Sequence, residues 1–399
     1  MKRVEQAPRK DWKQEVEALG FDFHTMDGML YWDESAACEF TAAEIDLIED
    51  ACDTLHKLCL QAVEHLVARG EIGRLGIPGH VAEAVTRSWR AHEPALYGRF
   101  DLAWDGNGPP KLLEYNADTP TALFEASVVQ WHWLETVHPD ADQFNSIHEG
   151  LVDRWRAMFG PGAPDAGGIH LACTMPHVED EGTLRYLQAT ALEAGIATKA
   201  LAMEDIGWND NGDGGRFVDR EDQPIRTLFK LYPWEWLAAE QFGANLFDLL
   251  ARGGIRVVEP AWKMLLSNKG ILPVLWELFP DCPYLVPAFD DPTRFAPGDV
   301  VVAKPRLGRE GANISIARLG PEGRPEGAPL LETQGPYGQS GWVFQARAPL
   351  AQAEASDGAV RHMVIGAWMI GDKCRGIGLR EDDTAITRNT SRFVPHYFV

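Results

Sequence analysis

Two spacings of apolar residues occur along this chain, one typical of helices and one typical of strands. The longest helical pattern begins with a capping box, Thr41 to Glu44, and continues with apolar residues three and four positions apart until Gly70. Residues 97–104 and 111–116 instead alternate between apolar and polar, and the turn between them is rich in Gly, Asn and Pro. We therefore predict a long amphipathic helix followed by a β-hairpin.

The middle of the chain has the pattern of an α/β unit. Residues 168–173 are typical of a buried strand, a helical run then ends at Gly195, and residues 199–203 give a second strand. Strand, helix and strand in this order are typical of a doubly wound sheet. Residues 209–215 superficially resemble a calcium loop, but they lack its alternating ligands and closing glutamate, so we predict a turn.

The last third of the chain predicts one helix and several short strands. Helical spacing lies between Lys269 and Phe279, with Asn268 as the expected cap. Strands are expected at residues 284–286, 300–303, 342–345, 363–370 and 374–379, the last two forming a hairpin. The predicted fold class is α/β, and a chain of 399 residues favours two to three domains.

Composition and charge narrow the function classes. The chain carries 59 Asp and Glu against 37 Lys and Arg, for a formal net charge of −22, which argues against a nucleic-acid partner. An acidic surface kept for solubility explains this charge, and steering of cationic substrates is the alternative. The start of the chain has no apolar leader, no run approaches the length of a membrane span, and the six cysteines form no CxxC pair. We therefore expect a cytoplasmic protein that is not bound to a membrane.

A basic loop with two glycines follows the expected strand at 300–303. Lys304 ends that strand, and the loop carries Arg306, Gly308, Arg309 and Gly311. Glycine lets a backbone approach an anion closely, while backbone N–H groups and basic side chains bind phosphate oxygens. The loop predicts a flap over a polyphosphate, although an ordinary basic hairpin would contain the same residues.

Polar side chains on the predicted hairpin form a candidate metal site. Arg99 and Asp101 lie two positions apart on one face of their strand, as do Glu114 and Asn116 on the returning strand. If the strands pair, Asp101, Glu114 and Asn116 meet as a set of hard oxygen donors suited to Mg²⁺. From spacing alone, a solvated polar face of an exposed hairpin is the more common explanation.

Lys269 and Lys304 complete a candidate site for phosphoryl transfer. Two lysines at the ends of secondary-structure elements can hold different phosphates of one nucleotide as point charges. Cys173 and His177 are close in the sequence, but this spacing at a strand end is more often structural than catalytic.

Six motifs in order resemble the glutathionylspermidine synthase family, which are carbon–nitrogen ligases of the ATP-grasp fold. They lie at residues 99–101, 114–121, 229–236, 267–269, 304–313 and 386–396. The resemblance runs from about residue 12 to the end and covers the synthetase part, with no amidase domain expected ahead of it. It implies an ATP-grasp fold with a preceding doubly wound region. The implied domains are 1–95 (N-terminal helical region), 96–260 (substrate domain carrying the metal hairpin) and 261–399 (nucleotide-binding region with a phosphate lid at 300–317).

The resemblance also implies roles for individual residues. Arg99 would be catalytic and would stabilise the transferring phosphoryl group and the tetrahedral intermediate. Mg²⁺ would be held by Asp101, Glu114 and Asn116. ATP would be bound by Lys269, Lys304, Arg306, Gly308, Gly311 and Gln345, the last beside the adenine. The acid substrate and the acceptor phosphate would be contacted by Thr119, Thr121 and Arg380.

The reaction expected from the resemblance joins a small-molecule acid to an amine through an acyl phosphate, with release of ADP and phosphate. Glutathione or another peptide is a candidate acid, and a polyamine is a candidate amine. Such catalysis depends on positioning and charge neutralisation, which suits a metal, lysines and an arginine. Two alternatives stay open: a catalytically silent ATP-binding protein that acts through a partner, and a phosphotransferase with no amide product.

Overall fold

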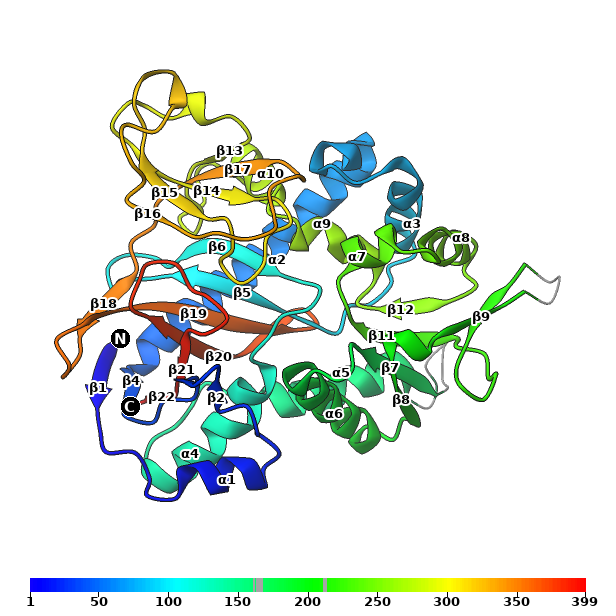
Figure 1. The fold of residues 1–399 in the computed structure, drawn as a ribbon, viewed down its shortest axis with the longest axis horizontal. Helices are drawn as coiled ribbons and strands as arrows, with labels where there is room; N and C mark the ends of the chain where they lie inside the picture. Colours follow the sequence, from blue (N-terminus) through cyan, green and yellow to red (C-terminus); the bar gives the residue numbers. More distant parts are fainter. Residues whose placement is uncertain (161, 163–167, 211–213) are drawn as a thin grey trace.

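The computed structural model describes residues 1–160, 162, 168–210 and 214–399. Its elements form three lobes, one around a central antiparallel sheet, one around a parallel sheet and one around a lid sheet (Figure 1). The lobes meet near the middle of the molecule, where the loop after β14 hangs toward β5 and β6 (Figure 1). The predicted mixture of helices and strands is confirmed.

The central sheet joins strands from distant parts of the sequence. Its order is β21–β20–β19–β5–β6, with β18 also paired to β19. The strands are β5 (Tyr97–Ala103), β6 (Lys111–Asn116), β18 (Ala351–Glu354), β19 (Val360–Ile370), β20 (Lys373–Asp382) and β21 (Arg392–Val394). Both predicted hairpins, β5–β6 and β19–β20, are confirmed, and antiparallel pairing of β5 with β19 places them in one sheet.

Helix α2 (Ala42–Arg69) packs on this sheet and confirms the predicted amphipathic helix. The Thr41 side chain accepts a hydrogen bond from the Glu44 backbone, and the Glu44 carboxylate accepts one from the Thr41 backbone. Gly70 ends the helix in the left-handed conformation, with φ of 70°. The apolar residues three and four positions apart are buried against the core, as the pattern requires.

The second lobe is a parallel sheet in the order β8–β7–β11–β12. The strands are β7 (Ile169–Cys173), β8 (Thr198–Ala202), β11 (Thr227–Leu231) and β12 (Arg256–Val258), and a small hairpin is formed by β9 (Gly207–Asn209) and β10 (Arg216–Val218). The helices of this region are α3 (Gly79–Arg90), α5 (Ile147–Phe159), α6 (Val178–Glu193), α7 (Trp234–Ala239) and α8 (Gly243–Arg252). The predicted strand–helix–strand unit is confirmed as β7, α6 and β8. The turn predicted at 209–215 includes residues 211–213, which lie outside the described residues.

The third lobe is the lid sheet, in the order β13–β17–β14–β15–β16. Its strands are β13 (Ala288–Phe289), β14 (Val300–Pro305), β15 (Ser315–Arg318), β16 (Leu331–Glu332) and β17 (Trp342–Ala346), and α9 (Met264–Ser267) and α10 (Ile271–Leu278) precede it. The strand predicted at 284–286 is wrong: residues 285–287 have no regular structure and the nearest strand is β13. Pro283 and Pro287 flank that segment, and proline has no N–H to donate to a ladder.

The two ends of the chain lie together. Strands β1 (Lys2–Glu5), β4 (Ala36–Phe40) and β22 (His396–Phe398) form a three-stranded sheet, near which the N and C labels stand (Figure 1). The remaining elements are α1 (Trp12–Ala18), β2 (Thr25–Met26), β3 (Met29–Leu30), α4 (Gln130–Val137), a π-helical turn η2 (Glu125–Val129), and the 3-10 turns η1 (Ile72–Leu75), η3 (Met203–Asp205), η4 (Ala261–Lys263), η5 (Pro292–Arg294) and η6 (Pro321–Gly323).

The proposed domain boundaries stay a prediction. The pairing of β5 with β19 crosses the boundary at 260/261, since it joins the 96–260 segment to the 261–399 segment in one sheet.

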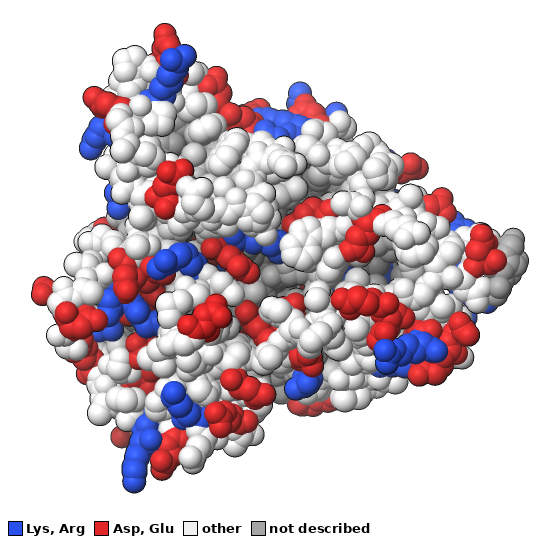
Figure 2. Space-filling view, viewed as in Figure 1, with Lys and Arg blue, Asp and Glu red and all other residues white. Residues whose placement is uncertain are grey.

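Acidic side chains are spread over the whole face seen in Figure 2 rather than gathered in one patch.

Candidate active site

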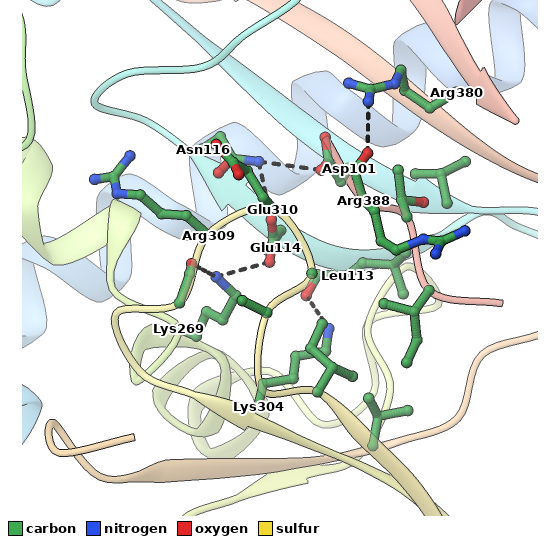
Figure 3. A pocket seen from close by; sticks show the side chains of 18 of the residues that line it. Asp101, Leu113, Glu114, Asn116, Lys269, Lys304, Arg309, Glu310, Arg380 and Arg388 are labelled. Atoms are coloured by element: carbon green, nitrogen blue, oxygen red, sulfur yellow. Dashed lines mark hydrogen bonds and ion pairs between the residues drawn. The ribbon is translucent and has the colours of Figure 1, made fainter. Parts of the chain in front are cut away.

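The β5–β6 hairpin brings three polar side chains together at a cavity between the lobes. Asp101 stands opposite Glu114 in the ladder, and Arg99 stands opposite Asn116. The Asn116 amide donates to Asp101 Oδ2 at 3.2 Å and to Glu114 Oε1 at 3.1 Å. The predicted meeting of Asp101, Glu114 and Asn116 is therefore confirmed as geometry (Figure 3).

Arg99 connects this cluster to the following loop. Its guanidinium donates to both oxygens of Asp101, at 2.7 Å and 3.0 Å, and to the Thr121 carbonyl at 2.5 Å. The two parallel N–H···O bonds to one carboxylate fix the plane of the guanidinium. Arg99 is thus held at the mouth of the hairpin, facing the cavity.

Two lysines approach the hairpin from the third lobe. Lys269 lies 3.0 Å from Glu114 Oε2, and Lys304 Nζ donates to Gln345 Oε1 at 2.8 Å and to the Leu113 carbonyl at 3.0 Å. Burial opposes ionisation of Glu114, but the charges of Lys269 and Lys304 outweigh it and lower the pKa of Glu114 to about 2. Burial lowers the pKa of Lys304 to about 8, against the opposing effect of Glu114.

The loop at residues 306–313, the lid loop, arches over these lysines (Figure 3). Lys269 Nζ donates to the Gly308 carbonyl at 2.6 Å. At Gly311, where φ is 67°, an added Cβ would lie 2.2 Å from the Thr387 carbonyl, so this position admits only glycine without movement of the backbone. The lid loop is therefore packed directly against the segment that follows β20.

Arg306 and Arg309 of the lid loop point in different directions. The Arg306 guanidinium turns away from the cavity, donating to the Arg74 carbonyl at 2.9 Å and to Asp290 Oδ1 at 2.8 Å. Arg309 lines the cavity instead. The structure therefore does not bring Arg306, which we predicted to bind ATP, to the other site residues.

The residues predicted to contact substrate line the same cavity. Thr119 Oγ1 accepts a hydrogen bond from Arg309 at 2.7 Å, and the carbonyl of Thr121 accepts from Arg99. The buried Arg380 donates to the carbonyls of Ser391, Arg388 and Asn389, which shapes the loop after β20. Arg380 thus joins the lining of the cavity to the loop after β20.

A family model described as "Glutathionylspermidine synthase preATP-grasp" matches residues 3–399 of the chain. The chain belongs to the glutathionylspermidine synthase family. A Haemophilus influenzae protein named "Putative acid--amine ligase" is 43% identical over 409 residues, which cover 100% of both chains. The resemblance found in the motifs is therefore confirmed.

Two longer relatives share only part of their length with this chain. The trypanothione synthetase of Crithidia fasciculata is 28% identical over 85% of this chain and 53% of its own. The bifunctional glutathionylspermidine synthetase/amidase of Escherichia coli is 25% identical over 89% of this chain and 58% of its own. The chain thus spans just over half of these two relatives. The expected enzyme class, an ATP-dependent carbon–nitrogen ligase, is confirmed by membership of the glutathionylspermidine synthase family.

The donor set of this family member is chemically suited to Mg²⁺. Within the described residues, no group of three His, Cys, Asp or Glu side chains is placed to hold a metal. The hairpin instead offers a mixed set, made of two carboxylates and one amide. That number fits Mg²⁺, which takes one or two protein carboxylates and completes its shell with water and substrate phosphates. Glu114 stays ionised down to a pH of about 2, so it is available as a charged ligand.

The sequence-based site omitted three residues that line the cavity and one buried ion pair beside it. Arg309 was noted in the lid loop but not chosen, and Glu310 and Arg388 also line the cavity. Asp118 and Lys230, both buried, pair at 2.6 Å beside the loop that carries Thr119. The signal for this pair was present: a lysine within the apolar strand at 227–231 requires a buried partner.

No helix in the described parts of the chain is long and apolar enough to cross a membrane. The predicted cytoplasmic location stays a prediction.

Proposed function

We propose that the protein is an ATP-grasp ligase that uses ATP and Mg²⁺ to join a carboxylic acid to an amine. The observation that carries this proposal is the position of one ammonium group. Lys269 Nζ contacts Glu114, a member of the candidate metal set, and the carbonyl of Gly308 in the lid loop. A phosphate bound there would meet the metal ligands, a lysine and the lid at one point, as phosphoryl transfer requires.

The reaction proceeds in two steps. A carboxylate oxygen of the acid attacks the γ-phosphorus of ATP, the bond to the β-phosphate oxygen breaks, and ADP leaves. The amine nitrogen then attacks the carbonyl carbon, the C–N bond forms, the bond to phosphate breaks, and the amine loses a proton. When bound, Mg²⁺ would neutralise charge on the phosphates.

The chain's own residues are assigned to these steps by their positions. Asp101, Glu114 and Asn116 would hold the metal, and Lys304 would bind nucleotide phosphate beside Gln345. Arg99 faces the space between hairpin and lid, where it stabilises the negative charge of the transferring group. Arg306 has no part in this assignment, because its guanidinium is bound to Arg74 and Asp290.

We propose that the acid substrate contacts Thr119, Thr121 and Arg380. We also propose that this acid is glutathione or another peptide, and that the amine substrate is a polyamine. The relatives named above support this choice, since one is a glutathionylspermidine synthetase. The arginines that line the cavity suit an anionic acid, while the acidic surface of the protein suits a cationic amine.

The test is incubation of the purified protein with ATP, Mg²⁺ and pairs of acids and amines, with ADP release and product mass as readouts. We expect ADP release that requires both substrates and a product whose mass is that of an amide. ATP binding without turnover on any pair would favour the silent ATP-binding protein. A phosphorylated product without amide would favour the phosphotransferase.

A further inference from the structure

Arg309 links the lid loop to two other parts of the molecule. Its Nη1 donates to Thr119 Oγ1 at 2.7 Å, on the loop that follows the metal hairpin. Its Nε and Nη2 both donate to Glu235 Oε1, at 3.2 Å and 2.7 Å, on helix α7 of the parallel lobe. The guanidinium also lies 5.9 Å from the Trp236 ring. One side chain of the lid loop therefore contacts both the loop that carries Thr119 and helix α7 of the parallel lobe.

Glu235, the partner of Arg309, lies on a helix that is held in position by other contacts. It lies in the first turn of α7, where a carboxylate is favoured by the helix dipole. The helix itself is fixed elsewhere, because the Trp234 backbone donates to the buried Asp118 at 2.9 Å and the Trp234 indole donates to the Glu259 carbonyl at 3.1 Å. Loss of the Glu235 carboxylate would therefore remove the two bonds of Arg309 to α7 and leave its bond to Thr119, without displacing α7.

Two other contacts of the lid loop use groups that the reaction itself needs. Lys269 holds the Gly308 carbonyl, and Thr119 holds Arg309, so bound phosphate and bound acid compete for both. Glu235 has no assigned role with metal, nucleotide or acid, so substrates leave its contact with Arg309 in place. A charge-assisted pair with two N–H donors, whose side chains are 25% and 20% exposed, is stronger than a solvent-exposed ion pair.

We propose that Glu235 is a positioning residue that keeps the lid loop shut through Arg309, so that the acyl phosphate reacts with amine and not with water. This inference rests on the proposed ligase function. If the lid opens, water attacks the carbonyl carbon, the bond to phosphate breaks, and the acid is regenerated. ATP and water are then converted to ADP and phosphate with no amide formed.

The first measurement needs no substrate. Glu235→Ala removes the acceptor. Glu240→Ala is the matched control, since this exposed carboxylate follows α7 directly and, within the described residues, accepts only from the Tyr232 hydroxyl. Hydrogen exchange of the backbone amides of residues 307–313 should be roughly tenfold faster in Glu235→Ala. It should be unchanged in Glu240→Ala. Equal exchange in Glu235→Ala and wild type would overturn the proposal.

The second measurement is the ratio of phosphate released to amide formed, at saturating acid and amine. We expect a ratio near one for wild type and for Glu240→Ala, and a ratio several-fold higher for Glu235→Ala. A merely structural role would lower both products together and leave the ratio unchanged, which would count against the proposal. If Glu235→Ala proves unfolded, Glu235→Gln, which keeps an acceptor oxygen but no charge, takes its place with a smaller expected rise.

The two readouts separate failure of this inference from failure of the ligase assignment. If wild type forms no amide with any pair, the ligase assignment fails, while the exchange measurement still tests the anchor. If wild type forms amide and Glu235→Ala keeps both the exchange rate and the ratio of wild type, the anchor alone is refuted.

Discussion

Asp101 and Glu114 face each other across β5 and β6, and the amide of Asn116 donates to both. Two carboxylates held this close repel each other unless cations offset their charge. Arg99 supplies that charge to Asp101, and Lys269 supplies it to Glu114. In the proposed complex, Mg²⁺ would replace these cations as the partner of the two carboxylates. Arg99 and Lys269 would then be free to contact phosphate.

The first prediction follows from this arrangement. Asp101→Asn and Glu114→Gln should each lower kcat by roughly a hundredfold or more, because each removes a charged ligand from the proposed Mg²⁺ site. Excess Mg²⁺ should partly restore activity if the loss lies in metal affinity. Asp105→Asn in the turn of the same hairpin is the control, since in the described part of the chain the Asp105 side chain accepts only from the Asn107 backbone. Steady-state rates over a range of Mg²⁺ concentrations test this, and wild-type rates in both variants would contradict the metal assignment.

The second prediction concerns pH. Burial lowers the pKa of Lys304 to about 8, so the free protein loses this positive charge as pH rises through that value. Bound phosphate favours the charged form, so ATP affinity should be constant below the pKa and fall above it by about tenfold per pH unit. Titration calorimetry with ATP between pH 7 and 9.5 measures the slope. Lys304→Met should bind more weakly and without this slope, and an equal slope in the variant would show that another group titrates.

The sequence allowed the β5–β6 hairpin to be predicted because its information is local. Alternation places Asp101 with Arg99 on one face and Glu114 with Asn116 on another, and residues 104–110 connect the two strands directly, so that they pair as neighbours. The partner of β5 could not be predicted in this way. Trp368 pairs with Arg99 across a long separation in sequence, and alternation carries no information about which strand lies alongside.

The two arginines of the lid loop show a second limit. Arg306 and Arg309 lie three positions apart in a glycine-containing loop, and composition treats them alike. The conformation separates them, because a turn lies between the two arginines, in which the Gly308 N–H donates to the Pro305 carbonyl at 3.3 Å. Arg306 is left near Asp290, while Arg309 reaches Glu235 on a lobe that the local sequence does not specify.

The third prediction is about stability. Lys230 and Asp118 are both buried and pair at 2.6 Å, and Lys230 also lies 4.5 Å from the Trp234 ring. Lys230→Met leaves the Asp118 carboxylate buried without its cation, so the free energy of unfolding should fall by about 3–5 kcal/mol. Arg185→Ala, which breaks the exposed pair with Glu181, should change it by less than about 1 kcal/mol. Denaturant unfolding of both variants checks this, and similar small losses would show that Asp118 is hydrated or protonated once Lys230 is gone.

The last prediction separates closure of the lid from stability of the fold. Gly311→Ala places a Cβ against the Thr387 carbonyl, at a spacing of 2.2 Å that forces the lid loop away from the segment after β20. Gly327→Ala is the matched control, since Gly327 also has a positive φ, of 82°, but open space around its Cβ position. Both substitutions carry the backbone cost of a left-handed alanine, about 1 kcal/mol, in the free energy of unfolding. Gly311→Ala alone should also lower kcat, by roughly tenfold or more, because the lid cannot close fully over the phosphates. Unfolding curves and kcat are measured for both proteins, and equal kcat values in the two variants would mean that the contact of Gly311 with Thr387 has no part in turnover.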